Sequence, residues 1–371
     1  MFCDISIKKA FNFLTRLVTY EGKQMREQHR ITERKPLLKE DGTLTEEGWA
    51  TDLLLEYDKY KIKASWLRVK EWDFYYIIDH KRKHCLTCTI ADIGYLGLMA
   101  VCWIDFNKKK FVHFETMPIL PAGKTGLLPH SGDGRFTFEN SKILMKYNYS
   151  LPKRYITIEA PDFRWEEDDW GLAADISLYQ DPKLESMVRA TSWEKNRKAF
   201  YYNQKINCMP AKGTVRLGNK RYEFSPDSAM GGYDWGRGNW TYKNKWYWGT
   251  ASGYLDGKSI GWNVGYGFTD STPASENMLF YEGKAHKLDE VTFHLDPKDY
   301  LKPWKITSND DRFEMDFQPL VDRKSKINFL LIKSDQHRVF GYFTGHVILD
   351  NGKKLKVKDF LGIAEDFYHR W

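Results

Sequence analysis

The chain has 371 residues, with 57 Lys and Arg against 50 Asp and Glu, which gives a formal net charge of +7. Apolar residues make up 42% of it, which excludes a disordered chain, and five cysteines are too few for a disulfide scaffold. The composition stands out in its 14 Trp, 22 Tyr and 22 Phe, residue types that favour strands and suit pockets for flat or apolar ligands. At about 150 residues per domain, the length predicts two to three domains.

The first residues form a separate segment. Between residues 5 and 18, apolar side chains recur at helical spacing with basic residues among them. This pattern is typical of a helix on a membrane surface, or of an upstream extension to a chain that starts at Met25; we favour the extension. No apolar run is long enough to predict a transmembrane segment. The N-terminus also lacks the small-residue cleavage site of a secretory signal, so no such signal is expected. A cytoplasmic location is therefore expected.

From Trp66 onward the sequence has short, alternating, aromatic-rich runs separated by turns. Asp-Gly or Asn-Gly pairs supply the positive φ angles that tight hairpin turns need. They stand at Asp133-Gly134, Asp256-Gly257 and Asn351-Gly352. Regularly spaced hairpins of this kind predict a mainly β protein, a sandwich or barrel.

Helical signals are few. Thr45–Trp49 can form one turn, and 181–193 is expected to be a helix, with Asp181 as its cap and Pro182 in its first turn. A boundary is expected where this helix ends. We predict an extension over 1–26, a first barrel over 27–200 and a second barrel over 201–371. The C-terminal residues 360–367 fit either a helix or a strand that closes the second barrel.

Three familiar motifs fail. Gly123-Lys124-Thr125 lacks the upstream glycine of a phosphate-binding loop, because position 118 is proline. Cys85-x-x-Cys88 is half of a zinc site with no second half, so buried thiols are the better interpretation. The lysine clusters at 108–110 and 353–358 lie at expected hairpin turns and edges and form no nucleic-acid footprint. No cofactor, metal or nucleic acid is expected.

Residues 230–280 hold the most informative pattern. With a period of two, Asp234 and Asn263 each stand on a strand face that is otherwise glycine, whereas Trp235 and Arg237 lie on the face opposite Asp234. Glycine in a strand marks close approach by a ligand or a backbone, or a bulge where the strand bends. The first alternative predicts a cavity with polar groups rising into it.

Several motifs of the chain resemble one bacterial family. They include Lys70-Glu-Trp-Asp73, Asn203-x-Lys-Ile-Asn207, Asp234-Trp-Gly-Arg237, Thr272-x-x-x-Glu-Asn277 and the ending Ala364-Glu365…Arg370-Trp371. These residues, over about 27–371, are similar to the family known as domain of unknown function 2804.

A more distant similarity carries chemistry. The run from Gly213 to Arg237, followed by Trp246-Tyr-Trp248, resembles the carotenoid 1,2-hydratase-like proteins. The resemblance implies two lipocalin-like antiparallel β-barrels in tandem. It also implies that Asp234 matches the Asp that protonates the substrate alkene. Where those proteins carry Glu, this chain has Gly236 or Arg237, so the implied architecture carries over more readily than the chemistry.

Three functions follow from these patterns. The first is an enzyme that binds an apolar or amphipathic metabolite in a barrel cavity and hydrates, isomerises or cyclises it, with Asp234 as the acid. The second is a non-catalytic lipid or small-molecule carrier, in which Asp234 and Arg237 anchor a polar head group or pair with each other across a bulge at Gly236. The third is carbohydrate binding by stacked rings. The expected ligand-binding residues are Arg237, Trp235, Trp240, Trp246, Trp248, Asn263, Glu276, Asn277, Asn203, Lys205 and Glu365.

Overall fold

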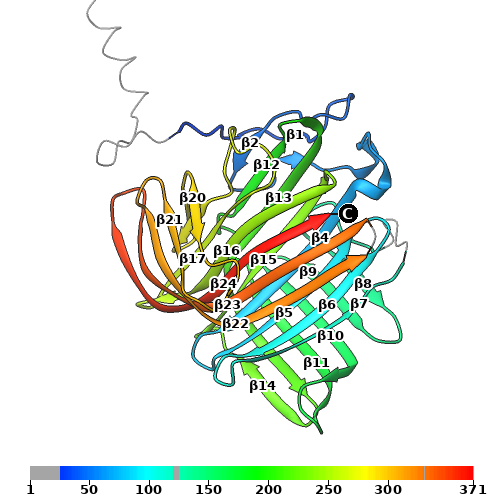
Figure 1. The fold of residues 1–371 in the computed structure, drawn as a ribbon, viewed down its shortest axis with the longest axis vertical. Coiled ribbons are helices and arrows are strands. Elements are labelled where there is room, and N and C mark those ends of the chain that lie inside the picture. Colours follow the sequence, from blue (N-terminus) through cyan, green and yellow to red (C-terminus); the bar gives the residue numbers. More distant parts are fainter. Residues whose placement is uncertain (1–25, 120–124, 330, 371) are drawn as a thin grey trace, which may run out of the picture.

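The computed structural model describes residues 26–119, 125–329 and 331–370, and in this part of the chain strands predominate. Two large sheets, antiparallel in all their strand pairs, curve beside one another (Figure 1). The mainly β class is confirmed. The described residues contain two short 3-10 helices, η1 (Lys59–Lys61) and η2 (Trp66–Arg68). The helix considered for residues 5–18 lies outside the described residues.

The first sheet has a central path of ten strands, in the order β7-β6-β5-β4-β15-β13-β11-β10-β9-β8, and β12, β2 and β14 pair beside it. Its strands are β2 (Gly48–Ala50), β4 (Val69–Asp79), β5 (His84–Asp92), β6 (Gly97–Asp105), β7 (Lys110–Thr116), β8 (Gly134–Glu139), β9 (Leu144–Ser150), β10 (Lys153–Arg164), β11 (Trp170–Tyr179), β12 (Met187–Trp193), β13 (Asn196–Leu217), β14 (Lys220–Phe224) and β15 (Ala229–Asn239). A small separate parallel pair joins β1 (Lys35–Pro36) to β3 (Leu55–Glu56).

The second sheet has the order β19-β18-β17-β16-β24-β23-β22-β21-β20. Its strands are β16 (Lys243–Leu255), β17 (Lys258–Tyr266), β18 (Met278–Tyr281), β19 (Lys284–Lys287), β20 (Val291–His294), β21 (Trp304–Ser308), β22 (Phe313–Phe329), β23 (Ile332–Ile348) and β24 (Lys354–Arg370). The C-terminal segment is thus a strand, paired on both sides.

The chain passes from the first sheet to the second at a different place from the boundary expected at residue 200. Strand β13 runs through that position, and β15 still pairs with β4 in the first sheet. The second sheet begins at β16, which a short connection joins to the end of β15. We therefore propose that the two halves divide between Asn239 and Lys243.

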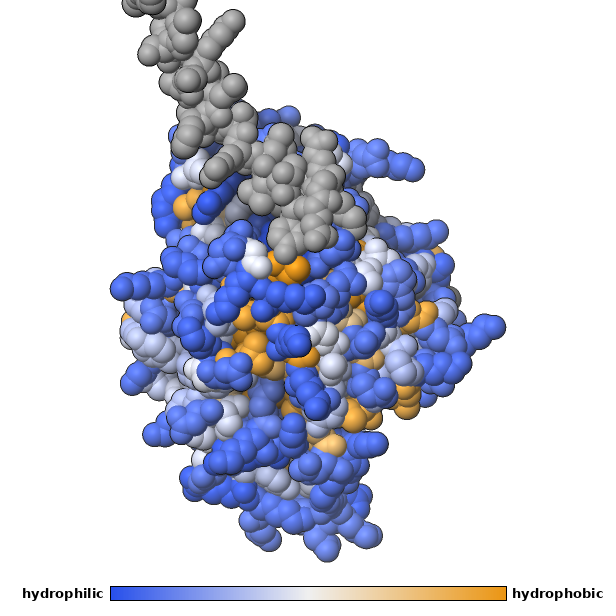
Figure 2. All heavy atoms as spheres, turned by 90° about the vertical axis from the view of Figure 1, so that its left-hand side faces the viewer, coloured by the Kyte–Doolittle hydropathy of each residue, from blue (hydrophilic) through white to orange (hydrophobic). Residues whose placement is uncertain are grey.

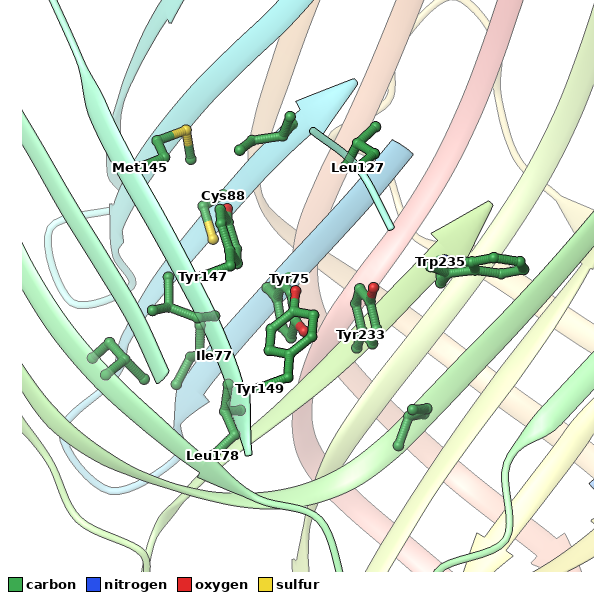
Figure 3. Packing of buried hydrophobic residues seen from close by; sticks show 14 of the residues in the cluster. Tyr75, Ile77, Cys88, Leu127, Met145, Tyr147, Tyr149, Leu178, Tyr233 and Trp235 are labelled. Atoms are coloured by element: carbon green, nitrogen blue, oxygen red, sulfur yellow. The ribbon is translucent and has the colours of Figure 1, made fainter. Parts of the chain in front are cut away.

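Alternation along β4 shows how the sheets pack. Tyr75 and Ile77 point into a core enclosed by the first sheet, where Figure 3 shows Tyr75 beside Tyr233. Phe74 and Tyr76, on the other face, pack against residues of the second sheet. A third cluster fills the inside of the second sheet. Each sheet therefore has its own core, and a further apolar layer joins the two sheets.

Two of the expected turns carry the required backbone. Asp256 and Gly257 both have positive φ, 51° and 77°, between β16 and β17. Glycine tolerates this region best, and Asp is among the few other residues that enter it readily. Gly352, in the turn before β24, also has a positive φ of 80°.

Two expected helical segments are wrong. Met187–Trp193, within the helix expected over 181–193, is β12 and pairs with β13 and β2. The helical turn expected over Thr45–Trp49 is replaced in part by β2, which begins at Gly48. In both places pairing with distant strands decides the backbone conformation.

The beginning of the described chain is attached to the second half of the molecule. The Gln28 side chain donates to the carbonyl of Leu288 (2.9 Å) and accepts from the backbone N–H of Ser275 (2.7 Å). The His29 N–H donates to the Pro273 carbonyl (2.9 Å). We call residues 28–29 the N-terminal strap. It ties together segments that are far apart in the sequence, since Gln28 and Ser275 are 247 positions apart.

The face shown in Figure 2 is mostly hydrophilic, with hydrophobic residues showing in small groups between charged ones. Among the described residues, no helix has the length and apolar character that crossing a membrane would require.

Candidate functional site

A cavity of about 210 Å³ lies between the two sheets, lined by residues from both. Alternate residues of β4, including Trp72 and Phe74, form one wall, and β22, β23 and β24 form the other. The sequence patterns predict a ligand inside a barrel. Core side chains pack inside the curve of each sheet, and this cavity lies between the two sheets rather than inside either one.

Aromatic rings form much of the cavity wall. They are Trp72, Phe74, Tyr95, Tyr201, Trp240, Trp246, Trp248, Phe268 and Phe367. Several contact each other directly: the Trp72 ring lies 5.3 Å from that of Trp240, edge to face, and Trp246 stacks on Phe268 at 4.9 Å. Packed rings hold one another in place and offer flat apolar surface to a ligand.

Asp234 enters this cavity from the centre of β15. Strand pairing places it between Lys205 of β13 and Phe74 of β4. The Lys205 Nζ lies 2.6 Å from Asp234 Oδ1 and 5.0 Å from the centre of the Trp248 ring. The side chains of Lys205 and Asp234 are only 6% and 14% exposed, so the ion pair is shielded from bulk water.

Burial raises the pKa of Asp234 above its usual value. Lys205 opposes this increase through its charge and hydrogen bond, whereas the negative charge of Glu276 adds to it. Glu276 is itself buried, with Oε1 4.0 Å from the Arg189 guanidinium. Asp234 therefore has a cation in contact with it and feels the charge of a second carboxylate, so its proton affinity depends on what fills the cavity.

The glycines flanking Asp234 have a structural reason. A Cβ at Gly232 would lie 2.3 Å from the Tyr76 ring, and a Cβ at Gly236 would lie 2.2 Å from the Trp72 ring. The two glycines thus leave room on β15 for two aromatic rings from β4. One of them, Trp72, lines the cavity beside Asp234. The glycines serve the cavity indirectly, by letting its aromatic wall lie close to β15.

The wall from the second sheet is also charged. Arg338 donates from Nε to Glu365 Oε1, and its guanidinium lies 4.2 Å from the Phe74 ring centre. Arg323 is its cross-strand neighbour. His369 stacks on Trp246 at 4.9 Å, and burial lowers its pKa to about 3, so it is neutral near pH 7.

The structure brings seven of the predicted residues into the cavity wall. They are Asp234, Lys205, Trp240, Trp246, Trp248, Glu276 and Glu365. They come from β13, β15, β16, β24 and the connections near them, so residues far apart in the sequence meet here. Glu365 pairs with Arg338 across β23 and β24.

Arg237 and Trp235 lie elsewhere, on the opposite face of β15. Arg237 is fully buried and binds Asp73 at 2.9 Å and Glu71 at 3.7 Å. Its guanidinium also donates to the backbone carbonyls of Trp72, Gly236 and Leu128. Figure 3 shows Trp235 with the core residues of the first sheet. The bulge that would pair Asp234 with Arg237 is absent, because β15 keeps an unbroken register with β4.

The three predicted asparagines are buried behind the cavity rather than in its wall. Asn263 accepts from the Trp248 indole at 2.7 Å and donates to the Glu276 carbonyl at 2.7 Å, so it positions two wall residues. Asn277 accepts from the Gly265 N–H and donates to the Asp289 carbonyl. Asn203 pairs in register with Arg189 of β12.

Other wall residues escaped the sequence patterns. Arg323, Arg338 and His369 come from the last three strands, and Trp72 from a motif whose residues had no assigned role. Alternation assigns a residue to a face but does not tell which distant strand that face meets. The Lys70–Asp73 motif was the signal that could have pointed to Trp72.

Among the described residues, no group of three or more His, Cys, Asp or Glu side chains is placed to hold a metal ion. Cys85 and Cys88 are buried free thiols, as the alternation within this segment indicated. Cys85 packs in the layer between the sheets and Cys88 in the first core. Because they face opposite sides of β5, they cannot share a ligand.

Comparison with solved structures supports the fold. The crystal structure of CghA with Sch210972 matches with a TM-score of 0.50 and 12% identity, over 81% of this chain and 88% of that one. A protein described as a putative AttH from Nitrosomonas europaea matches with a TM-score of 0.50 and 10% identity, over 84% and 96%. Kievitone hydratase from Nectria haematococca gives 0.47 and 11%, over 91% and 98%. The first two likenesses concern the fold alone, and together with the two curled antiparallel sheets they support the expected tandem lipocalin-like architecture.

A search of curated proteins gives no match. The family model described as domain of unknown function 2804 matches residues 28–371, which is nearly the whole chain and includes both sheets and the cavity between them. The chain therefore belongs to the family of domain of unknown function 2804.

Proposed function

We propose that the protein binds an apolar or amphipathic small molecule in the cavity between its sheets and that Asp234 transfers a proton to or from it. One observation carries this proposal: a shielded Asp234–Lys205 pair opens onto a cavity walled by aromatic rings. A cavity with a few placed polar groups in apolar surroundings is the usual form of a small-molecule site.

The chemistry follows from the surroundings of Asp234. Its raised pKa brings its proton closer to the range in which a carboxyl group acts as an acid or base near neutral pH. Lys205 can stabilise negative charge that remains on Asp234 after it gives up its proton. The rings of Trp72, Trp246 and Trp248 present faces that favour a developing positive charge on the ligand. Hydration, isomerisation and cyclisation of an unsaturated ligand are reactions that need this arrangement.

A carrier is the second candidate, and the ion pair itself favours it. Asp234 already has a cation at 2.6 Å, so the pair can hold a polar head group without any proton transfer. The CghA crystal structure of similar fold was determined with Sch210972, and a bound compound fits either candidate.

The test compares Asp234→Asn with the wild-type protein. Small molecules that remain bound after gentle purification are identified by native mass spectrometry and then added back to both proteins. An enzyme converts the added molecule, and Asp234→Asn lowers that rate by about 10²–10⁴-fold while the molecule still binds. A carrier returns the molecule unchanged, and the variant releases it.

Asp316→Asn is the matched control, because Asp316 is an exposed residue of β22 that does not line the cavity. It is expected to behave as the wild type. If Asp234→Asn binds and processes the molecule normally but loses several kcal/mol of stability, Asp234 belongs to the scaffold and the proposal is wrong.

A further inference from the structure

One charged group in the cavity lacks a matching charge. Arg323 of β22 is 5% exposed and lines the cavity. Its Nη2 donates to the Gln336 side chain at 3.1 Å, and its Nε has no hydrogen-bond partner among the described residues. No carboxylate of the described residues forms an ion pair with it, whereas the other arginine of this wall, Arg338, has Glu365.

The position of Arg323 makes its charge costly. Strand pairing sets it directly opposite Arg338, and Glu365 then lies opposite Arg338 on β24. This row holds two guanidinium groups and one carboxylate. The other acidic group that attracts Arg323 is Glu115, which is already hydrogen-bonded to His113 at 2.9 Å. The two cations therefore have one carboxylate fully available between them.

The surroundings of Arg323 disfavour its positive charge. Burial, reinforced by the repulsion from Arg338, lowers the pKa of Arg323 to about 10, although arginine normally stays charged far above that value. At neutral pH the group remains a cation. A buried cation that lacks a counter-charge is destabilising, and an anion placed against it removes that penalty.

On the basis of the proposed function, we infer that the ligand carries an oxyanion, such as a carboxylate, at one end of an apolar body, and that Arg323 binds this oxyanion. A guanidinium presents donors in a planar fork that matches a carboxylate or phosphate. Its free Nε supplies one of these donors. Trp246, Phe367 and Ile327 line the same cavity and provide contacts for the apolar body. The substrate class is therefore an amphipathic acid rather than a neutral hydrocarbon.

Calorimetric titration with three probes of equal chain length tests this inference: decanoate, decyl phosphate and decan-1-ol, at pH 7.4 and below their aggregation concentrations. Wild-type protein is expected to bind decanoate, decyl phosphate or both at least tenfold more tightly than decan-1-ol. The relative affinities of the two anions tell a carboxylate ligand from a phosphate ligand. Arg323→Gln is expected to remove this preference and leave the affinity for decan-1-ol unchanged.

Lys324→Gln is the matched control, because Lys324 neighbours Arg323 on β22, is exposed and does not line the cavity. It removes one positive charge from the same region and is expected to leave the preference intact. A thermal melt of Arg323→Gln is expected to show stability equal to or above that of the wild type, which excludes misfolding as the cause of the lost preference.

The outcomes separate the two proposals. Equal affinity of the wild type for all three probes, or an equal loss of all three in Arg323→Gln, overturns the inference about the acid and leaves the proposed binding site standing. Absence of binding for every probe overturns both. A loss of the preference in Lys324→Gln as well would show that general positive charge, rather than Arg323, attracts the anions.

Discussion

The two faces of β15 hold buried charges of contrasting kinds. On one face, Arg237 contacts two carboxylates and three backbone carbonyls inside a filled core. On the other face, Asp234 has one ion pair, with Lys205, and lines a cavity. A buried charge whose partners are all supplied by the protein stabilises a single structure. A buried charge beside empty volume keeps interactions available for a ligand, which is why we propose a functional role for Asp234 and a structural role for Arg237.

Replacing Arg237 by Met should lower the stability of the protein, because Arg237 holds together the face of β15 that lies in the filled core. The change leaves the buried Asp73 without its cation and removes one of the two cations near Glu71, and breaking such a buried pair typically costs about 3–5 kcal/mol. Chemical denaturation measures the free energy of unfolding. Arg216→Met, at an exposed position of β13, is the control and should change stability by less than about 0.5 kcal/mol. Similar losses in both variants would remove the contrast between the two faces.

A pH series compares two histidines that lie away from the cavity, His80 and His84, with His369 in the cavity wall. Burial lowers the pKa of His80 and His84 to about 4 and that of His369, in the cavity wall, to about 3. These residues are neutral in the folded protein but take up protons near pH 6.5 when it unfolds. Their contribution is thus complete above about pH 6.5 and is lost as the pH falls toward about 4.

The loss for each of these imidazoles should approach about 1.4 kcal/mol per pH unit, so stability should decline from about pH 6.5 toward about pH 4 and stay level between about 7 and 8. Unfolding curves at half-unit intervals measure this. A ligand that fills the cavity should leave the decline due to His80 and His84 in place. A stability that is constant down to about pH 5 would show that water reaches all three rings.

Two tryptophan variants, one on each face of the comparison, should give the smallest loss of stability. Trp235→Phe and Trp248→Phe each remove part of a buried ring, and each should cost about 1–2 kcal/mol. Trp248 lines the cavity and Trp235 does not, so only Trp248→Phe should weaken binding of decan-1-ol or decanoate. Calorimetric titration of both variants checks this. Weakened binding in Trp235→Phe alone would mean that the ligand enters the core of the first sheet.

Local patterns predicted which face of a strand a residue occupies. The period of two placed Asp234 and Trp235 on opposite faces, and the register of β15 with β4 confirms that. Strand alternation and turn chemistry depend on neighbours in the sequence, so they are visible in the sequence itself. The same patterns failed over 181–193, where a capping Asp and a Pro suggested a helix, because pairing with β13 and β2 overrides local preference.

The composition of the cavity could be predicted only in part. Glycines around Asp234 signalled close approach, and the structure shows that what approaches is the rings of Trp72 and Tyr76. Arg323 and Arg338 could not be predicted as cavity residues, because nothing in the local sequence indicates that β22 and β23 pack across the layer from β4. Which faces of two sheets meet is decided by the packing of both whole sheets.

The N-terminal strap has a consequence for the time course of folding. Gln28 is made early by the ribosome, yet its hydrogen-bond partners at residues 275 and 288 are made only after most of the chain. Contacts of such long separation form slowly, because a large loop must close before they give any stabilisation. The first sheet needs no residue beyond Asn239 for its strand pairing. It can therefore assemble before the hydrogen-bond partners of the N-terminal strap have been made. Closure of the strap is therefore a late step, completed after the first strands of the second sheet are in place.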